Sequence, residues 1–407
     1  MNVLIVGLNY APEPIGIGPY TTGLAEYLAQ RDHRVEVVAG RPYYPQWRAY
    51  PGFARFAWRR TNEGGVSVTR CWHYIPRVPG GAKRILHHLT FALTALPVVA
   101  WGALRDRPDA VLCVAPSIMS AFPARIGAWL GGSKLWLHLQ DFEVDAAFAT
   151  GMVEGPRLAR ILLAAERAVL RMADMVSSIS PQMVARLIDK GVSPDRTYEL
   201  RNWANAVQSG ESAEPGFREE WQLGSRQVVL YSGNVARKQG AGLIVEAAQR
   251  LAGRDDLVFV ICGEGPELAI LKAQAEGLSN VRFNPLQPAV RLMELLELAA
   301  IHLLPQVDAA ADLVLPSKLT NMLLSGRPVI ATTLPGAGLY DEVEGCGLAI
   351  PPGDADALAA AIVRLADDPA QAAALGDAAR ARAAQRWSRD TILAGFERRL
   401  AALIEAS

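Results

Sequence analysis

Two lysines in the second half of the chain lie close to the predicted starts of helices, each of which follows a buried strand. Lys318 falls in the first turn of a helix that Pro316 and Ser317 open, and Lys238 precedes a helix over 241–251. A helix N-terminus offers unbonded backbone N–H groups and about half a positive charge. Two such ends with one lysine each suit a diphosphate. We therefore expect a phosphate-bearing ligand, in the first place a nucleotide sugar.

Short glycine-containing loops follow three predicted strands and are further candidates for contact with this ligand. Glycine lets the backbone approach a ligand closely. The residues concerned are Gly16, Gly18, Gly233, Asn234, Gly263, Glu264 and Gly265. The first loop does not have the GxGxxG spacing of a dinucleotide site. The alternative for each loop is an ordinary turn between a strand and a helix, and Pro266 suits the first position of such a helix.

A histidine and three carboxylates occur within eight residues after another predicted strand. His138 ends the apolar run LWLH, and Asp141, Glu143 and Asp145 follow in one loop. Sites in parallel α/β sheets form at the carboxyl ends of strands, so these side chains are candidates for binding sugar hydroxyls or acting as a base. The alternative is that His138 is a hydrogen-bonded structural residue.

These residues require a parallel α/β scaffold, and strand–helix alternation along the whole chain predicts one. In the first half we expect strands at 3–6, 35–38, 110–114, 134–138 and 175–179. In the second half we expect them at 228–231, 257–262, 281–284, 300–304, 328–331 and 348–350. A polar connection after residue 205 separates two domains, 1–205 and 206–387. The helix over 388–407 is expected to pack back on the first domain.

Composition limits the classes of function. The 407 residues, 51% hydrophobic and 20% charged, can bury two cores. A net charge of zero argues against a nucleic-acid partner. The four cysteines show no metal-ligand spacing and suit a reduced cytosolic protein. The short apolar N-terminus has no basic region and reads as a first strand, which favours a cytoplasmic location.

The chain resembles the retaining glycosyltransferases of family 4, and in particular the colanic acid biosynthesis (WcaI-like) group. The likeness spans nearly the whole chain. The motifs that carry it are NYAPEPIGIGPYTTGLAEYL, GRPYYPQW, HLQDFEVDAAF, RNWAN, GNVARKQG, CGEGPE, HLLPQ and PSKLTNMLLSGRPV. The resemblance implies the GT-B fold, an α/β architecture of two Rossmann-like domains facing across a deep cleft. The first domain would bind the acceptor and the second the donor.

The resemblance also implies a reaction. A hexosyltransferase of this kind moves a sugar, such as fucose or another hexose, from a nucleoside diphosphate sugar to a lipid-linked acceptor in exopolysaccharide assembly. It implies His138 and Asp141 as active-site residues and Lys238 and Lys318 as counter-charges for the departing diphosphate. The helix start adds Pro316, Ser317 and Leu319 to the donor site. No cofactor and no metal is expected, because lysines and helix ends can neutralise the leaving group.

The chain departs from the wider family at three positions. The usual pair of glutamates would fall at Leu313 and Asn321, and Asn234 replaces an arginine that many relatives carry. Asn321 is expected to bind ribose in place of the second glutamate. Because of these departures, two alternatives stay open: a nucleotide-sugar 2-epimerase and a non-catalytic nucleotide-sugar-binding protein.

Two segments of the first half predict peripheral contact with an anionic membrane, on the inner face of the cell membrane. The stretch 89–104 has no charge, but it is interrupted by Pro97 and is shorter than the roughly 20 residues that a span needs. The stretch 47–60 mixes aromatic residues with arginines, which suits a lipid headgroup layer. Its alternatives are an ordinary covering loop or a nucleic-acid surface.

Overall fold

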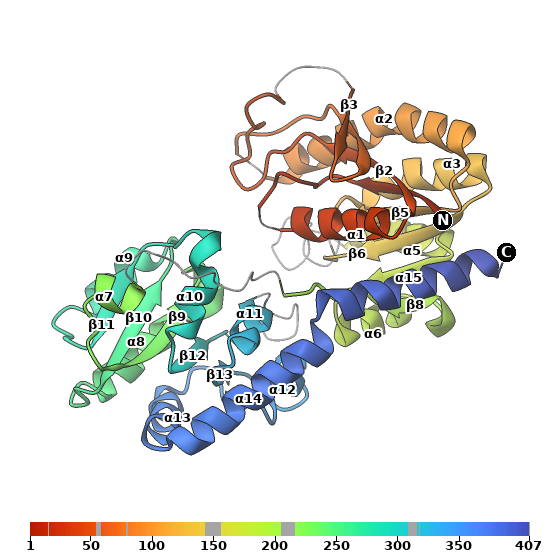
Figure 1. Ribbon diagram of the computed structural model, residues 1–407. Helices are drawn as coiled ribbons and strands as arrows, with labels where there is room; N and C mark the ends of the chain where they lie inside the picture. The colour runs from red at the N-terminus through yellow and green to blue at the C-terminus, as the bar shows by residue number, and fades with distance from the viewer. Residues whose placement is uncertain are drawn as a thin grey trace. The chain divides into compact units, whose positions relative to one another are not determined.

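The computed structural model describes residues 1–407 except 15, 54–57, 79, 143–155, 205–215, 308–315, 317 and 407, and side chains except those of 156–159, 238 and 289 (Figure 1). Two compact units divide the chain: Met1–Asn202 with Ile392–Ser407, and Trp203–Thr391. The first unit therefore ends three residues before the predicted boundary, and most of the last helix belongs to it.

An eight-stranded sheet forms the first unit, in the order β3-β4-β2-β1-β5-β6-β7-β8. Its strands are β1 (Asn2–Gly7), β2 (Arg34–Gly40), β3 (Arg59–Glu63), β4 (Val66–Cys71), β5 (Ala110–Ala115), β6 (Lys134–Leu139), β7 (Met175–Ser178) and β8 (Thr197–Glu199). All neighbours are parallel except β3 and β4. The five predicted strands are confirmed. The sequence RRTNE of β3 gave no strand signal, because this mostly exposed edge strand has no apolar face.

Six helices and two short 3₁₀ turns complete what the structure describes of the first unit. They are α1 (Gly18–Gln30), α2 (Gly81–Asp106), η1 (Ile118–Ser120), α3 (Ala121–Gly131), α5 (Pro156–Met172), α6 (Pro181–Asp189), η2 (Pro194–Arg196) and α15 (Arg389–Glu405). The ring of Phe396 in α15 packs 4.9 Å from that of Trp136 in β6. Glu397 accepts a 3.2 Å hydrogen bond from Tyr27 and pairs with His33 at 2.8 Å. These contacts attach the end of the chain to the first unit.

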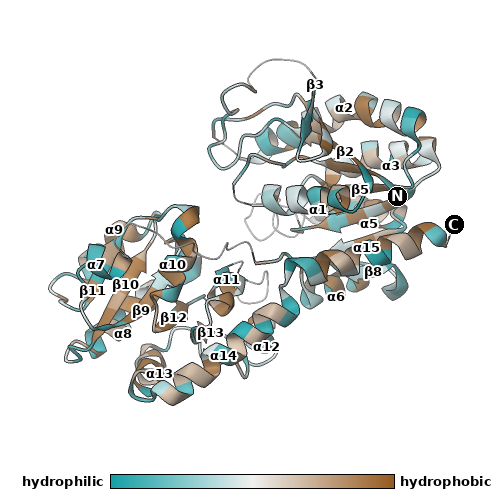
Figure 2. Cartoon of the chain, viewed as in Figure 1, coloured by the Kyte–Doolittle hydropathy of each residue, from teal (hydrophilic) through white to brown (hydrophobic). Residues whose placement is uncertain are grey.

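The second unit contains a six-stranded parallel sheet in the order β11-β10-β9-β12-β13-β14. Its strands are β9 (Gln227–Ser232), β10 (Leu257–Cys262), β11 (Val281–Asn284), β12 (Ile301–Leu304), β13 (Val329–Thr332) and β14 (Gly347–Ile350). All six predicted strands are confirmed. Most are apolar runs of four to six residues, although β11 (VRFN) contains an arginine and an asparagine, and hydropathy colouring shows brown on the central strands β9, β10 and β12 (Figure 2). Burial on both faces explains such runs.

Helices cover both faces of this second sheet. They are α7 (Phe217–Glu220), η3 (Arg237–Gln239), α8 (Gly242–Arg250), α9 (Leu268–Gln274), η4 (Ala289–Arg291), α10 (Leu292–Glu297), α11 (Lys318–Leu324), α12 (Gly338–Val343), α13 (Ala355–Asp367) and α14 (Pro369–Arg386). One core joins α8, α9 and α13 to the sheet, and a second joins α10, α11, α12 and α14 to it. Asp354 caps α13 by accepting a 2.8 Å hydrogen bond from the Ala357 N–H. The Asp354-Ala355-Asp356 sequence is therefore a helix start, as the sequence predicts.

Both sheets have a point at which the strand order reverses. In the first unit β1 lies between β2 and β5, and in the second β9 lies between β10 and β12. Loops that leave neighbouring strands at such a point run to opposite faces of the sheet and open a crevice at the carboxyl ends of the strands. The predicted site residues follow β1, β6, β9, β10 and β12, so the fold places them at these carboxyl edges.

Candidate active site

Lys318 lies beside the loop that follows β9 in the second unit. Its Nζ donates a 3.1 Å hydrogen bond to the hydroxyl of Tyr231 and lies 4.2 Å from the centre of the Tyr231 ring. The Tyr231 hydroxyl donates in turn to the carbonyl of Asn234 at 2.6 Å. Burial raises the pKa of the Tyr231 phenol, which keeps the hydroxyl protonated. The structure thus holds the ammonium group of Lys318 at the switch point between β9 and β12.

The predicted glycines bring two loops into backbone contact. A side chain at Gly233 would meet the Lys318 ammonium at 3.1 Å, and a Cβ at Gly263 would lie 1.9 Å from the Gly233 carbonyl oxygen. A Cβ at Gly265 would lie 2.1 Å from the Val235 carbonyl oxygen. The N–H of Gly233 donates to the carbonyl of Cys262 at 2.9 Å, and this bond joins the loops after β9 and β10. Close packing of the two loops is therefore one physical reason for these glycines.

The remaining predicted donor residues have different surroundings. Asn234 and Glu264 are exposed on the two joined loops, whereas Leu319 is fully buried in the core with only its backbone near the start of α11. Pro316 lies just before that helix, and its carbonyl accepts from the N–H of Leu319 at 3.0 Å. Ser317 lies outside the described residues. The backbone of Lys238 lies in η3, which directly precedes α8.

Asn321 lies one turn after Lys318 on α11. Its Oδ1 is buried, and among the described residues no hydrogen-bond donor reaches it. Residues three apart on a helix share a face. A buried acceptor without a hydrogen bond costs about 1–3 kcal/mol. A ligand hydroxyl that donates to Asn321 Oδ1 would remove this cost, which would favour binding of the ligand. Leu313, the other position of the family's glutamate pair, lies outside the described residues.

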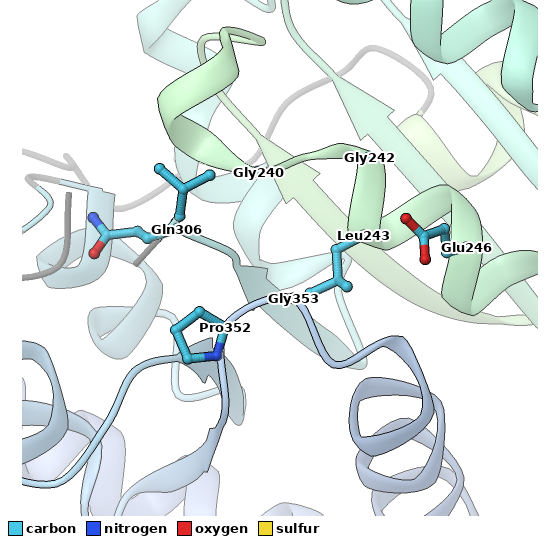
Figure 3. A pocket seen from close by; sticks show the side chains of 8 residues that line it. Gly240, Gly242, Leu243, Glu246, Gln306, Pro352 and Gly353 are labelled. Carbon is cyan, nitrogen blue, oxygen red and sulfur yellow. The ribbon is translucent and has the colours of Figure 1, made fainter. Parts of the chain in front are cut away.

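Sequence reasoning missed a pocket of about 370 Å³ beside the start of α8 (Figure 3). It is lined by Gly240, Gly242, Leu243, Glu246, Gln306, Val307, Pro352 and Gly353. Gln306 is fixed at the end of β12, because its N–H donates to the Thr332 hydroxyl at 2.6 Å and that hydroxyl donates back to the Gln306 carbonyl at 2.8 Å. The HLLPQ motif was the available signal for Gln306, whereas nothing in the sequence pointed to Pro352 or Gly353.

His138 in the first unit is a buried member of a hydrogen-bond network. Its Nδ1 lies 2.9 Å from the Ser177 hydroxyl and its Nε2 lies 3.0 Å from the Gln140 amide nitrogen. Gln140 and Asn202 also exchange two amide hydrogen bonds, of 2.9 and 2.8 Å. Burial lowers the pKa of His138 to about 4, so the imidazole is neutral at neutral pH. In this arrangement, His138 has no ring nitrogen left to accept a substrate proton.

Asp141 lies two residues after β6 with an exposed side chain. The sequence groups it with His138, but the structure separates their environments, one at the surface and the other in the core. Glu143 and Asp145 lie outside the described residues.

The loop after β1 is held by a carboxylate that sequence reasoning did not single out. Glu13 is buried, and it accepts hydrogen bonds from the N–H groups of Tyr43 at 2.8 Å and Tyr44 at 3.0 Å. Burial raises the pKa of Glu13, and these bonds oppose the rise. Gly18 packs over Glu13, where a Cβ would meet the Glu13 Cβ at 3.1 Å, and the exposed Gly16 has a φ of +74° that favours glycine. The loop is therefore preorganised at the start of α1.

The stretch 47–60 has several partners within the first unit. The ring of Trp47 packs 5.2 Å from that of Tyr43. Arg60 pairs with Glu36 at 3.2 Å, and Arg59 lies 6.0 Å from the centre of the Phe53 ring. Residues 54–57 lie outside the described part of the chain. The predicted membrane contact of this stretch stays a prediction.

Comparisons with known proteins agree with this architecture. Residues 16–203 match a family model described as a glycosyl transferase 4-like domain, and residues 226–368 match one described as glycosyl transferases group 1. The chain is 37% identical over 380 residues to WcaI of Escherichia coli K12, which is named for colanic acid biosynthesis as a glycosyl transferase. That match covers 89% of this chain and 91% of WcaI. A second match covers 213 residues, which are 50% of this chain and 54% of the alpha-D-kanosaminyltransferase of Streptomyces kanamyceticus. The two are 28% identical over these residues.

Solved structures show the same fold. Sucrose-phosphate synthase from Thermosynechococcus elongatus matches over 100% of both chains, with a TM-score of 0.72 and 20% identity. HepE of Anabaena in complex with UDP matches over 99% of this chain and 100% of its own, with a TM-score of 0.69 and 17% identity. Fold, family models and the full-length relative agree, and the chain belongs to the family 4 glycosyltransferases of the GT-B fold, next to the colanic acid biosynthesis glycosyl transferases.

Proposed function

We propose that this enzyme is a retaining glycosyltransferase that moves a sugar from a nucleoside diphosphate sugar to a lipid-linked acceptor in exopolysaccharide biosynthesis. The observation that carries the proposal is the position of Lys318, whose ammonium group lies against the glycine loop at the switch point of the second sheet. A fixed cation at the carboxyl edge of a parallel sheet suits a diphosphate. The colanic acid name of the full-length relative supports the polymer class.

Most residues of the proposed donor site lie in the second unit. Lys318 and Lys238 would neutralise the departing diphosphate, with the start of α8 as a further source of N–H groups. Asn321 Oδ1 would accept from a ribose hydroxyl. A nucleoside diphosphate sugar is also supported by relatives: HepE was solved with UDP-glucose, and one relative is named a GDP-mannose-dependent alpha-mannosyltransferase. The nucleobase and the sugar, fucose or another hexose, stay open.

In the proposed reaction the acceptor oxygen bonds to the anomeric carbon while the bond to the diphosphate breaks. The departing phosphate oxygen takes the acceptor proton on the same face of the sugar, so the configuration is retained. No metal ion is required in this scheme, because the lysines stabilise the leaving charge. His138 would position neighbouring groups rather than transfer a proton, since both ring nitrogens are bonded. Asp141, Gly16 and Gly18 would contact substrate in the first unit.

The proposed acceptor is lipid-linked, and the enzyme would therefore work as a cytoplasmic protein in peripheral contact with an anionic membrane. Two other functions fit part of the observations. A Listeria monocytogenes protein that carries the name of a UDP-N-acetylglucosamine 2-epimerase, without that activity being established, has a related fold, with a TM-score of 0.62 at 13% identity. A non-catalytic nucleotide-sugar-binding protein would explain the departure from the glutamate pair at Asn321.

A donor screen followed by product analysis tests the proposal. Thermal unfolding with UDP-, GDP- and TDP-sugars identifies the donor, because a ligand at about 100 times its Kd stabilises by about 2.7 kcal/mol. The stabilising donor is then incubated with a lipid-linked sugar acceptor. A new glycoside supports the proposal. A donor sugar epimerised at C2 supports the epimerase, and donor binding with neither product supports the binding protein.

A further inference from the structure

The outer faces of α2 and α3 in the first unit are apolar although they are exposed. On α2 the large exposed side chains recur with helical spacing at Leu86, Leu89, Leu93, Trp101 and Leu104. On α3 the exposed side chains are Phe122, Ile126 and Trp129. Trp101 is 66% exposed and Trp129 is 73% exposed. Surface helices of soluble proteins carry polar residues on such a face, and large exposed apolar side chains gathered on neighbouring helices indicate an interaction site. We call these eight residues the α2–α3 face.

The inner sides of the same helices belong to the core of the unit. Phe91, Ala95 and Val99 of α2 are fully buried, and a Cβ at Gly127 of α3 would meet Val99 at 2.5 Å. The two helices therefore pack closely side by side (Figure 1). Among the described residues α2 is the one helix with the length and apolarity of a membrane span, yet its core contacts would be lost in a span. The α2–α3 face can instead lie on a surface while the core stays intact.

The charges around this face are mostly positive. Lys83 and Arg84 are exposed in the first turn of α2, and Arg105 and Arg107 are exposed at its end. Residues 81–131 contain five basic residues, the fifth being Arg125, and two acidic ones, so their net charge is 5 − 2 = +3. One of the acids, Asp106, pairs both with Arg34 and with Arg105, each at 2.5 Å. Tryptophans and leucines between basic ends are the composition of helices that lie in the interface of an anionic bilayer.

We propose that the α2–α3 face is the surface by which this enzyme docks on an anionic lipid bilayer. The proposal deepens the proposed function, since it rests on a lipid-linked acceptor as the reason for being at a membrane. The apolar side chains would enter the boundary between headgroups and acyl chains, and the basic residues at the ends of α2 would meet the anionic headgroups. This assigns the contact to the helices rather than to the stretch 47–60.

Vesicle sedimentation of the full chain tests the surface. The double variant Trp101→Glu with Trp129→Glu places two charges in the α2–α3 face. Its control, Ile161→Glu with Ile270→Glu, adds the same charges at exposed isoleucines of α5 and α9. With vesicles of phosphatidylcholine and about one third phosphatidylglycerol, we expect the control to bind like the wild type and the double variant to bind at least about tenfold more weakly.

The charge contribution is tested with Lys83→Gln and Arg84→Gln, which should each weaken binding about fivefold at low salt and have little effect at high salt. Equal binding of wild type and the double variant, or no wild-type binding, would overturn the proposal. A wild type that is dimeric without vesicles, and that the double variant turns into a monomer, would assign the face to a second copy instead. Thermal shift by the donor sugar is measured on every variant. It reports on the second unit. A wild type that binds the donor but not vesicles therefore contradicts the docking surface alone, whereas a wild type that binds no donor contradicts the proposed function.

Discussion

Replacing Lys318 by alanine should remove most of the transfer activity while the fold remains. The ammonium group is 3.1 Å from the Tyr231 hydroxyl and 4.2 Å from the ring centre, and it faces the Gly233 loop. If it stabilises the leaving diphosphate, its loss should cost about 2–4 kcal/mol in the transition state, or about 30- to 1,000-fold in kcat/KM. If it only packs on Tyr231, its loss should cost about 0.5–2 kcal/mol of stability and leave kcat/KM nearly unchanged.

Steady-state kinetics and thermal unfolding on the same preparations separate these two outcomes. The matched control is Lys272→Ala, since Lys272 in the same unit also lies over an aromatic ring, 5.9 Å from the centre of Phe283, but on the exposed side of α9. We expect Lys272→Ala to keep normal kinetics. A Lys318→Ala enzyme that keeps kcat/KM within about threefold of wild type would refute the assignment of Lys318 to the donor site.

Three further predictions follow from the same geometry. Asn321→Ala should weaken nucleotide binding about five- to 150-fold by calorimetry, because it removes the buried acceptor proposed for ribose; unchanged affinity would exclude that role. The folded state resists protonation of His138, whose pKa of about 4 lies below its unfolded value, so this contribution to stability is present above about pH 6.5 and lost as pH falls toward 4. Thermal unfolding of wild type and His138→Gln across this range should show a shallower pH dependence in the variant, and identical slopes would contradict it. Activity in EDTA should equal activity without it, whereas a loss that Mn²⁺ or Mg²⁺ specifically restores would show that a metal takes part.

Local sequence patterns predicted five of the eight strands of the first sheet and all six of the second, because most of these strands are apolar and buried. The same patterns could not predict the contact between Lys318 and Tyr231, because 87 residues separate them. The two residues meet because β9 and β12 are parallel neighbours in the sheet and α11, which begins at Lys318, follows β12. Strands β3, β4 and β8 were missed. The residues RRTNE of β3 carry no apolar period, and β8 is only three residues long.

Within the candidate site, sequence reasoning found residue types but not their environments. It grouped His138 with Asp141, yet a neighbouring strand supplies Ser177 as a partner for His138. It passed over Glu13, which accepts from the side chain of Asn9 and from backbone N–H groups about 30 residues away that leave no signature in the sequence. Side chains fixed by distant backbone groups are visible only in the folded chain.

The anomeric configuration of the product tests the central claim of retaining transfer most directly. The glycoside formed from the identified nucleotide sugar and a lipid-linked acceptor is purified, and its anomeric proton is examined by NMR spectroscopy. The proposed mechanism predicts the configuration of the donor, since the departing diphosphate and the incoming hydroxyl share one face of the sugar. A product of opposite configuration would contradict it.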